Sequence, residues 1–417
     1  MAVHAKLVSR CVFKGEGHDE QIDPGQMAPQ ATNYETMDRK VMEKSVNPIN
    51  KPTPRPGILD IAPYVPGRSG KDADKDGYAG PIYKLSSNES ALGASPFAIA
   101  AYGENAGNLH LYPDGGATQL RTSISKHENI DPNRIICGAG SDEILQLLCR
   151  AYLGEGDNIV QSEHGFLVYS LAAQACGAVT HFAPETNLTA NVDTLLEFVD
   201  ERTRLVFIAN PNNPTGTYLP ASEIERLHAG LRSDIILVID AAYAEYMEED
   251  DYDCGAELVE RFDNVIMTRT FSKIYGLGAL RLGWAYGAPE IIDALHRIRG
   301  PFNVSSAAQI AGIAAIEDQD FVRRNLVHNR TQRDIMVQRV RGLGLEVHPS
   351  FGNFILVKFP MEEGFSASQM ETWLASKGVM VREMKAYRLP DYLRISIGSE
   401  EANACLMDLL EKKFAKA

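Results

Sequence analysis

Short apolar runs alternate with amphipathic stretches along the middle of the chain. The strand-length apolar runs lie at 135–137, 158–160, 205–209, 235–239 and 265–267. Stretches with helical periodicity lie between them, for example at 144–153 and 221–231. Continuous apolar strands that alternate with helices are typical of a mostly parallel sheet with helices on both faces. The pattern therefore predicts an α/β fold.

The two ends of the chain follow different patterns. Residues 1–56 have no sustained periodicity and end in alternating prolines, which predicts a poorly ordered extension or linker, with a partly helical arm at 34–44 as an alternative. A helix-rich stretch at 296–338 precedes strand signals at 353–357, 379–381 and 393–397. This C-terminal part predicts a smaller α+β domain.

Composition and charge narrow the function classes. The 417 residues are 44% hydrophobic, and no apolar run approaches the ~18 residues of a membrane helix. Lys and Arg number 41 against 55 Asp and Glu, so the net charge of −14 argues against general nucleic-acid binding. The six cysteines form no C-x-x-C pair, so no metal site or disulfide scaffold is expected. They favour a reducing, cytoplasmic location. A weakly basic N-terminus leaves organelle targeting as the minority alternative.

Polar side chains follow the predicted strands, and ligands of parallel sheets bind beyond the carboxyl ends of strands. Lys273 comes soon after the run at 265–267, next to a Gly-rich turn. It is either a surface lysine or an amine that condenses with an aldehyde. Asp240 ends the fourth run, where it is a helix cap, half of a buried ion pair, or the partner of a pyridinium nitrogen. Tyr243 is three residues further on and could reach the same ring.

Two further strand ends carry candidate ligand groups. Asn213 lies in a turn of Pro, Asn, Thr and Gly after the third run, and its amide could donate to a phenolate oxygen. Gly138 to Glu143 fails the G-x-G-x-x-G fingerprint but predicts a helix beginning at Ser141 and Asp142. Such a helix N-terminus can bind one phosphate, and Arg281 could neutralise it.

These residues carry a resemblance. Asn210-Pro-Asn-Asn-Pro-Thr-Gly216, Asp240-x-x-Tyr243 and Ser272-Lys273 with Arg281 resemble fold-type I pyridoxal-phosphate (PLP) aminotransferases. More closely, residues 57–412 resemble histidinol-phosphate aminotransferases. The segments that carry this second resemblance are 62–67, 84–89, 111–114, 140–143, 352–354 and 389–394. The resemblance implies the type I PLP-dependent transferase fold. It also implies a small domain formed by 57–96 and by the part after a bridging helix in 301–417, around a large PLP-binding domain at 97–300.

The resemblance also implies roles for the cofactor-side residues. Lys273 would hold PLP as a Schiff base and shuttle a proton, Asp240 would pair with the ring nitrogen, and Asn213 and Tyr243 would contact the ring oxygen. The residues expected at the cofactor phosphate are Ser141, Asp142, Thr270, Ser272 and Arg281. Phe166 would stack on the ring, with Tyr169 as the alternative candidate.

Substrate-side and partner roles follow from the same resemblance. Arg394 would anchor a carboxylate through a bidentate fork. Tyr64 and Arg382 would help to hold the substrate phosphate or distal group, and Asn353 lies in a matching substrate-side segment. Tyr112 would reach the phosphate of the neighbouring subunit, which implies a homodimer. Without the resemblance, both arginines could equally form surface ion pairs, worth only ~0–1 kcal/mol each.

Transamination of L-histidinol phosphate with 2-oxoglutarate is the activity that the resemblance implies. It would give imidazole acetol phosphate and L-glutamate in histidine biosynthesis. Ser90-Ala91 and Arg388 depart from the usual pattern and bear on the exact substrate. An aromatic amino-acid aminotransferase is therefore the nearest alternative, and a PLP decarboxylase, such as one acting on threonine phosphate, is a second.

Overall fold

The computed structural model describes residues 52–63 and 78–415. The chain separates into two units, Met1–Pro54 and Arg55–Ala417. Residues 52–54 of the first unit have no regular structure, as their prolines predict, and the rest of the predicted extension, with the arm at 34–44, lies outside the described residues. The domain boundaries expected near residues 97 and 301 stay predictions, since Arg55–Ala417 forms one compact unit.

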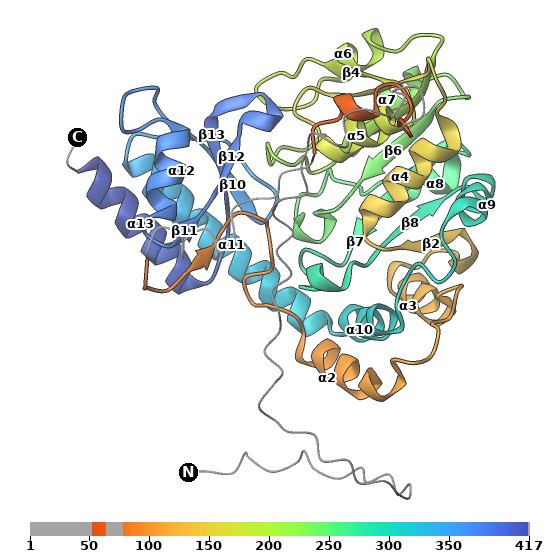
Figure 1. The fold of residues 1–417 in the computed structure, drawn as a ribbon, viewed down its shortest axis with the longest axis horizontal. Coiled ribbons are helices and arrows are strands. Elements are labelled where there is room, and N and C mark those ends of the chain that lie inside the picture. Colours follow the sequence, from red (N-terminus) through yellow and green to blue (C-terminus); the bar gives the residue numbers. More distant parts are fainter. Residues whose placement is uncertain (1–51, 64–77, 416–417) are drawn as a thin grey trace, which may run out of the picture. The chain divides into compact units, whose positions relative to one another are not determined.

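A seven-stranded sheet forms the centre of the second unit (Figure 1). Its order is β2-β8-β7-β6-β5-β3-β4. The strands are β2 (Ile135–Gly138), β3 (Asn158–Ser162), β4 (Val179–Ala183), β5 (Thr203–Ala209), β6 (Ile236–Asp240), β7 (Val265–Thr270) and β8 (Gly283–Gly287). β8 runs opposite to the other six strands, which all run in one direction, so the prediction of a mostly parallel sheet is confirmed.

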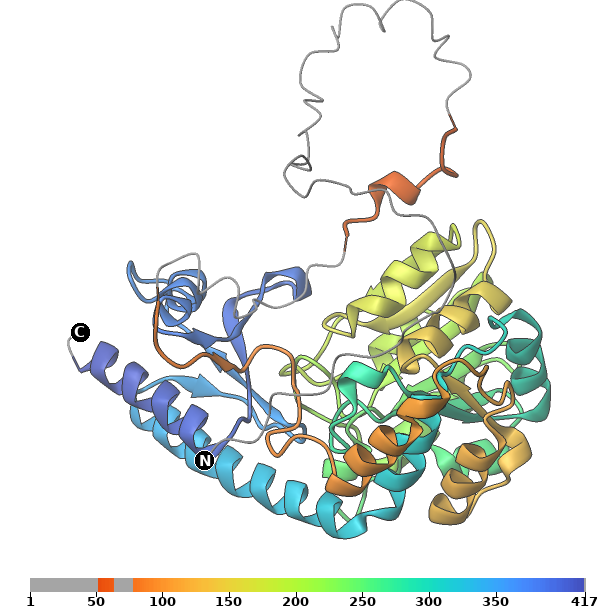
Figure 2. The same cartoon turned by 60° about the horizontal axis from the view of Figure 1, so that its bottom comes forward.

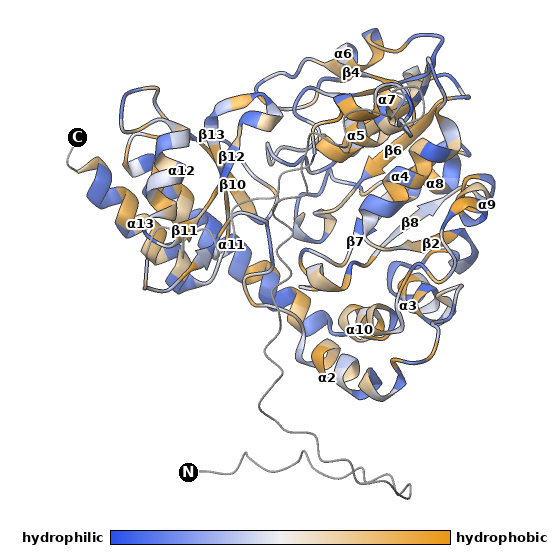
Figure 3. Cartoon of the chain, in the orientation of Figure 1, coloured by the Kyte–Doolittle hydropathy of each residue, from blue (hydrophilic) through white to orange (hydrophobic). Residues whose placement is uncertain are grey.

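Helices cover both faces of this sheet. Leu237 and Ile239 of β6 point into one core, whereas Val238 between them points into the other. The first core is closed by α3 (Thr118–Glu128), α6 (Val192–Glu197), α7 (Ala221–Gly230), α8 (Ala256–Arg261) and α10 (Ser306–Glu317). The second is closed by α4 (Ser141–Tyr152), α5 (Leu167–Ala175) and α9 (Pro289–Ile298). Each fully buried Val, Leu or Ile contributes about 1.5–3 kcal/mol, which explains why β6 is apolar on both faces (Figure 3).

A second, smaller sheet lies in the C-terminal part of the chain. Its order is β12-β13-β10-β9, all antiparallel. The strands are β9 (Glu346–Val347), β10 (Phe354–Lys358), β12 (Arg382–Met384) and β13 (Leu389–Ser396). A two-stranded pair joins β1 (Tyr83–Lys84) to β11 (Val379–Met380), so residues just before 85 lie beside the C-terminal part.

The long helix α11 (Gln319–Gly342) runs from α10 to the smaller sheet (Figures 1 and 2). Residues of α11 share a third core with α12 (Ala367–Ala375), α13 (Glu400–Phe414) and the smaller sheet. Helix α2 (Pro96–Glu104) packs against α10. In the described part of the chain, no helix is long and apolar enough to cross a membrane.

Candidate functional site

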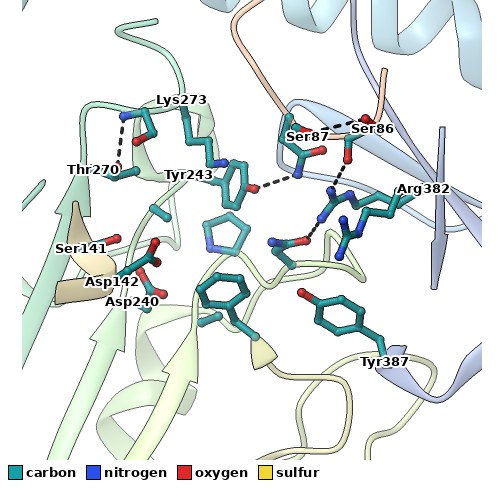
Figure 4. A pocket seen from close by; sticks show the side chains of 18 of the residues that line it. Ser86, Ser87, Ser141, Asp142, Asp240, Tyr243, Thr270, Lys273, Arg382 and Tyr387 are labelled. Atoms are coloured by element: carbon teal, nitrogen blue, oxygen red, sulfur yellow. Dashed lines mark hydrogen bonds between the residues drawn. The ribbon is translucent and has the colours of Figure 1, made fainter. Parts of the chain in front are cut away.

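A cavity of about 210 Å³ opens at the carboxyl ends of the large sheet, and side chains from the smaller sheet complete it. Its lining residues are Ser86, Ser87, Asn88, Ser141, Asp142, Phe166, Ala209, Pro211, Asn213, Asp240, Ala242, Tyr243, Thr270, Ser272, Lys273, Arg281, Arg382, Tyr387 and Arg394. Twelve of these are predicted site residues. Figure 4 shows Lys273 pointing into the cavity, with Ser141 and Asp142 on one side and Arg382 and Tyr387 on the other.

The sheet topology explains why the predicted residues meet. β6 lies between β5 and β7, and all three run in the same direction. Asp240 is the last residue of β6, Asn213 follows β5 and Lys273 follows β7. Because parallel strands end at one edge of the sheet, three distant segments deliver their polar groups to one place.

The N-terminus of α4 forms one wall. Its first amides have no partner within the helix, so they can bind an anion. Gly140 precedes Ser141 at a φ of 85°, and an added Cβ there would collide with the guanidinium of Arg281. A Cβ on Gly283 would likewise collide with the amide of Ser141. Glycine at position 140 therefore allows the close approach of Arg281, and glycine at position 283 allows the close approach of two backbone segments.

Arg281 is held beside this helix N-terminus by polar contacts. Its Nη2 donates to Asp142 Oδ2 over 3.1 Å, and its Nη1 donates to Ser272 Oγ over 3.3 Å. The amide of Ser272 donates to Thr270 Oγ1 over 3.0 Å. This wall combines amides, hydroxyls and one guanidinium, which is the donor set that a phosphate monoester needs.

Asp240 lies at the bottom of the cavity and is buried. Its Oδ2 accepts a 2.6 Å hydrogen bond from Tyr169 Oη, and its Oδ1 accepts a 3.0 Å bond from Thr268 Oγ1. Burial raises the pKa of the Asp240 carboxyl from 3.8 to about 6, against the lowering effect of these two donors. A buried carboxyl with a raised pKa gains from a cationic partner, and a protonated pyridine nitrogen is such a partner.

The structure distinguishes Phe166 from Tyr169. Phe166 lines the cavity, whereas Tyr169 is fully buried below it and stacks on Phe207 at a centroid distance of 4.6 Å. Burial raises the pKa of the Tyr169 hydroxyl well above its usual value. Tyr169 therefore supports Asp240 as a neutral donor and does not face the cavity, which leaves Phe166 as the candidate for stacking on a ring.

Lys273 and Tyr243 face each other across the cavity. The Nζ of Lys273 lies 5.7 Å from the ring centre of Tyr243. The hydroxyl of Tyr243 accepts a 2.9 Å hydrogen bond from Asn88 Nδ2. A primary amine and a phenol thus reach the same small space.

Two arginines approach from the smaller sheet. Arg382 and Arg394 are directly opposite each other in the β12–β13 pair, so their side chains leave the same face of the sheet. Arg394 is 5% exposed and donates to Asn213 Oδ1 over 2.5 Å and to the carbonyl of Ser86 over 2.9 Å. Two guanidinium groups on one face of the sheet can bind an anionic group in the cavity.

Two predicted residues that the structure describes, Tyr112 and Asn353, do not line the cavity. Tyr112 is 83% exposed and stacks on Phe302 beside a separate surface hollow. Asn353 is buried and donates to the carbonyls of Asn88 and Glu89 over 2.9 and 3.3 Å. Tyr64 lies outside the described residues.

Four polar lining residues were not predicted to be part of the site: Ser86, Ser87, Asn88 and Tyr387. The first three lie within segment 84–89, which carries the resemblance to histidinol-phosphate aminotransferases. The sequence therefore contained a signal that could have indicated them. Tyr387 follows β12 in a short turn, and no feature of its sequence neighbourhood indicates a site.

The comparisons with known proteins agree with this geometry. The family model "Aminotransferase class I and II" matches residues 81–410. The chain belongs to the class I and II aminotransferases. This aminotransferase is 53% identical to a histidinol-phosphate aminotransferase from Maricaulis maris over 364 residues, which cover 87% of the chain and 99% of the relative. A protein of the same name from Rhodospirillum centenum is 54% identical over 350 residues, covering 84% and 95%.

Solved structures of aminotransferases share the fold. The histidinol-phosphate aminotransferase from Sinorhizobium meliloti, solved in complex with pyridoxal-5'-phosphate, superposes with a TM-score of 0.80 at 26% identity. The match covers 87% of this aminotransferase and 97% of that chain. An L-threonine-O-3-phosphate decarboxylase from Porphyromonas gingivalis matches with a TM-score of 0.67 at 21% identity and shows the same fold only. The predicted type I fold is thus confirmed.

Proposed function

We propose that this chain transfers the amino group of L-histidinol phosphate to 2-oxoglutarate, with PLP as cofactor, and forms imidazole acetol phosphate and L-glutamate in histidine biosynthesis. The observation that carries the proposal is one cavity that joins Lys273, Asp240 and the Arg382–Arg394 pair in a chain about half identical to histidinol-phosphate aminotransferases.

The cavity offers a complementary group for each part of PLP. The phosphate would lie at the N-terminus of α4, against Arg281 and the hydroxyls of Thr270 and Ser272. Asp240 would hold the proton of the ring nitrogen, and Phe166 would cover one face of the ring. The ring oxygen would accept from Asn213 and Tyr243. When bound, PLP supplies an aldehyde that condenses with amines and a ring that takes up an electron pair.

Lys273 then has two roles in the proposal. Its Nζ would anchor the cofactor, and once the substrate amine has displaced it, the same nitrogen would remove a proton from the carbon that bears the amine and deliver it to the carbon on the other side of the amine nitrogen. The ring of Tyr243 lies beside this path, with its centre 5.7 Å from Nζ. Asp240 favours the protonated ring because its own carboxylate is costly to bury alone.

The arginine pair fits both substrates. L-Histidinol phosphate carries a phosphate and no carboxylate, whereas 2-oxoglutarate carries two carboxylates. Arg382 and Arg394 would take the anionic end of either molecule, because a guanidinium binds phosphate and carboxylate with the same fork.

We also propose a cytoplasmic homodimer in which Tyr112 completes the phosphate site of the neighbouring copy. Tyr112 is stacked on Phe302 and exposed, and its neighbours along the chain, Leu109 and Leu111, expose 76% and 56% of their surfaces. Such a cluster of exposed apolar side chains marks an interaction surface.

Mixed dimers test that role. Tyr112→Ala and Lys273→Ala subunits should each have little or no activity alone. Random mixing should give heterodimers with one intact composite site and restore about a quarter of the activity. No recovery after unfolding and remixing would show that Tyr112 does not act across the interface.

The substrate proposal is tested by initial rates. L-Histidinol phosphate should give a far higher kcat/KM with 2-oxoglutarate than L-phenylalanine does. A higher value for phenylalanine would establish the aromatic alternative instead. A decarboxylase is excluded by turnover of L-histidinol phosphate itself, since this donor has no carboxylate to lose.

A further inference from the structure

Asn88 occupies a position that the proposed reaction does not yet use. It lines the cavity, is 1% exposed and has a φ of 56°. This left-handed conformation is tolerated by Asn better than by most residues. The amide of Asn353 donates to the carbonyl of Asn88 over 2.9 Å, which holds that backbone in place. A buried polar side chain in an unusual conformation beside a site suggests a role there.

The hydrogen bonds of Asn88 fix which of its side-chain atoms donates and which accepts. Its backbone N–H donates to Ser396 Oγ over 2.8 Å, and Ser396 Oγ donates to Asn88 Oδ1 over 2.9 Å. This leaves Nδ2 as the donor, and it donates to Tyr243 Oη over 2.9 Å. The phenol oxygen of Tyr243 is thus an acceptor in this contact, so its own proton must point elsewhere. No acceptor for that proton is recorded among the residues that the structure describes.

We propose that Asn88 is a positioning residue that aims the hydroxyl proton of Tyr243 into the cavity, at the ring oxygen of the cofactor. The inference rests on the proposed function, because it needs a phenolate-type acceptor at that place. Asn88 does not touch the reacting carbon. It acts through Tyr243, whose ring is buried and lies beside Lys273.

Strand β13 prepares the second donor in the same way. Arg394 and Ser396 are two residues apart on β13, so their side chains leave the same face. Arg394 Nη1 donates to Asn213 Oδ1 over 2.5 Å, which turns the NH₂ group of Asn213 away from the arginine. Ser396 acts on Tyr243 through Asn88. One strand of the smaller sheet therefore orients both of the donors that the large sheet presents to the ring oxygen.

The expected effect is electrostatic. A hydrogen bond donated to the ring oxygen stabilises its negative charge and weakens its hold on the proton that it shares with the lysine nitrogen. Loss of the aimed donor should therefore raise the pH at which this proton leaves. The PLP absorption band near the visible range reports that protonation directly, independently of turnover.

The experiment is a pH titration of this band in the PLP-loaded full-length protein. Asn88→Ala should raise the midpoint by about one pH unit relative to the wild type. Ser396→Ala removes the bond to Asn88 Oδ1 and should raise it by a smaller amount. Asn158→Ala is the matched control, because Asn158 is also a buried, hydrogen-bonded asparagine. It is 3% exposed and bonded to Asp200 and Thr203 at the amino end of β3, whereas the cavity lies at the carboxyl ends of the strands. Its midpoint should stay at the wild-type value.

A double-mutant cycle with Tyr243→Phe tests the route. If Asn88 acts through the phenol, Asn88→Ala should add no further shift once the hydroxyl is gone. A full additional shift in the Tyr243→Phe background, or a wild-type midpoint in Asn88→Ala, would overturn the inference while leaving the proposed function intact. If Asn88→Ala fails to fold, the pH midpoint of Ser396→Ala tests the inference alone. A midpoint equal to that of the wild type would then contradict it. A wild-type protein with no such band would instead refute the proposed cofactor.

Discussion

Replacing Asp240 by Asn should stabilise the cofactor-free protein but strongly lower its activity. The Asp240 carboxyl is buried, and its pKa is raised from 3.8 to about 6. Asn keeps the shape and can still bond Tyr169 and Thr268, whose hydroxyls can each rotate to donate or accept. The substitution therefore removes a buried charge and little else.

The magnitude follows from linkage. Because the folded-state pKa lies above the unfolded one, folding favours the protonated acid, and this group lowers stability as pH rises from about 4 to 6. A rise of about two pKa units at 1.36 kcal/mol each gives roughly 3 kcal/mol of destabilisation near pH 8. About half of this destabilisation develops between pH 5 and pH 8, and the other half is already present at pH 5.

The assay is urea denaturation of the PLP-stripped wild type and Asp240→Asn at about pH 5 and pH 8. The free energy of unfolding of the variant should exceed that of the wild type at both pH values, and the difference should be roughly 1.5 kcal/mol larger at pH 8 than at pH 5. Added PLP should reverse the order, because a ring cation can pair with the carboxylate of the wild type only. The loss of a charge-assisted contact of about 3 kcal/mol would also lower kcat by roughly 100-fold.

A stability difference that is the same at both pH values would refute this reasoning, since only a titrating carboxyl gives the pH dependence. Greater stabilisation of the variant by PLP would refute the pairing of Asp240 with the ring nitrogen. The two results test separate steps, the burial of the charge and its partner.

Two further substitutions test the two ends of the cavity. Gly140→Ala forces a Cβ toward Arg281 at a φ of 85°, so the Kd for PLP in the stripped protein should rise about 10-fold, measured by absorbance titration; an unchanged Kd would contradict the close approach. Arg394→Lys keeps the charge but loses the fork that reaches Asn213 and Ser86, so KM for 2-oxoglutarate should rise at least ~10-fold with a smaller change in kcat. Equal KM values in steady-state assays would show that Arg394 does not bind the acceptor.

Much of the large sheet follows from local sequence. β5, β6 and β7 are apolar runs buried on both faces, so they were predicted within three residues of their observed ends. β4 and β8 were missed for physical reasons. β4 is a partly exposed edge strand containing Thr and His, and β8 reads Gly-Trp-Ala-Tyr-Gly, with a glycine at each end. β13 also begins earlier than expected, at Leu389, because Leu389 pairs with Met384 across a register shift.

Some site residues could likewise be predicted from local sequence, and others could not. Asn213, Asp240 and Lys273 follow predicted strands, so strand order alone brings them together. Asn88 follows the short strand β1, which pairs with β11 about three hundred residues away in sequence. No local pattern encodes that pairing. The choice between Phe166 and Tyr169 needed the structure too, since both are aromatic residues at the start of one helix and only burial separates them.

The most direct test of the central claim is the absorption spectrum of the PLP-loaded protein before and after adding L-histidinol phosphate alone. The account predicts a near-visible band that Lys273→Ala alters, that one equivalent of donor bleaches, and that 2-oxoglutarate restores. Bleaching by aromatic amino acids but not by L-histidinol phosphate would contradict the proposed substrate. If wild type and Lys273→Ala gave the same spectrum, Lys273 would not be the residue that holds the cofactor.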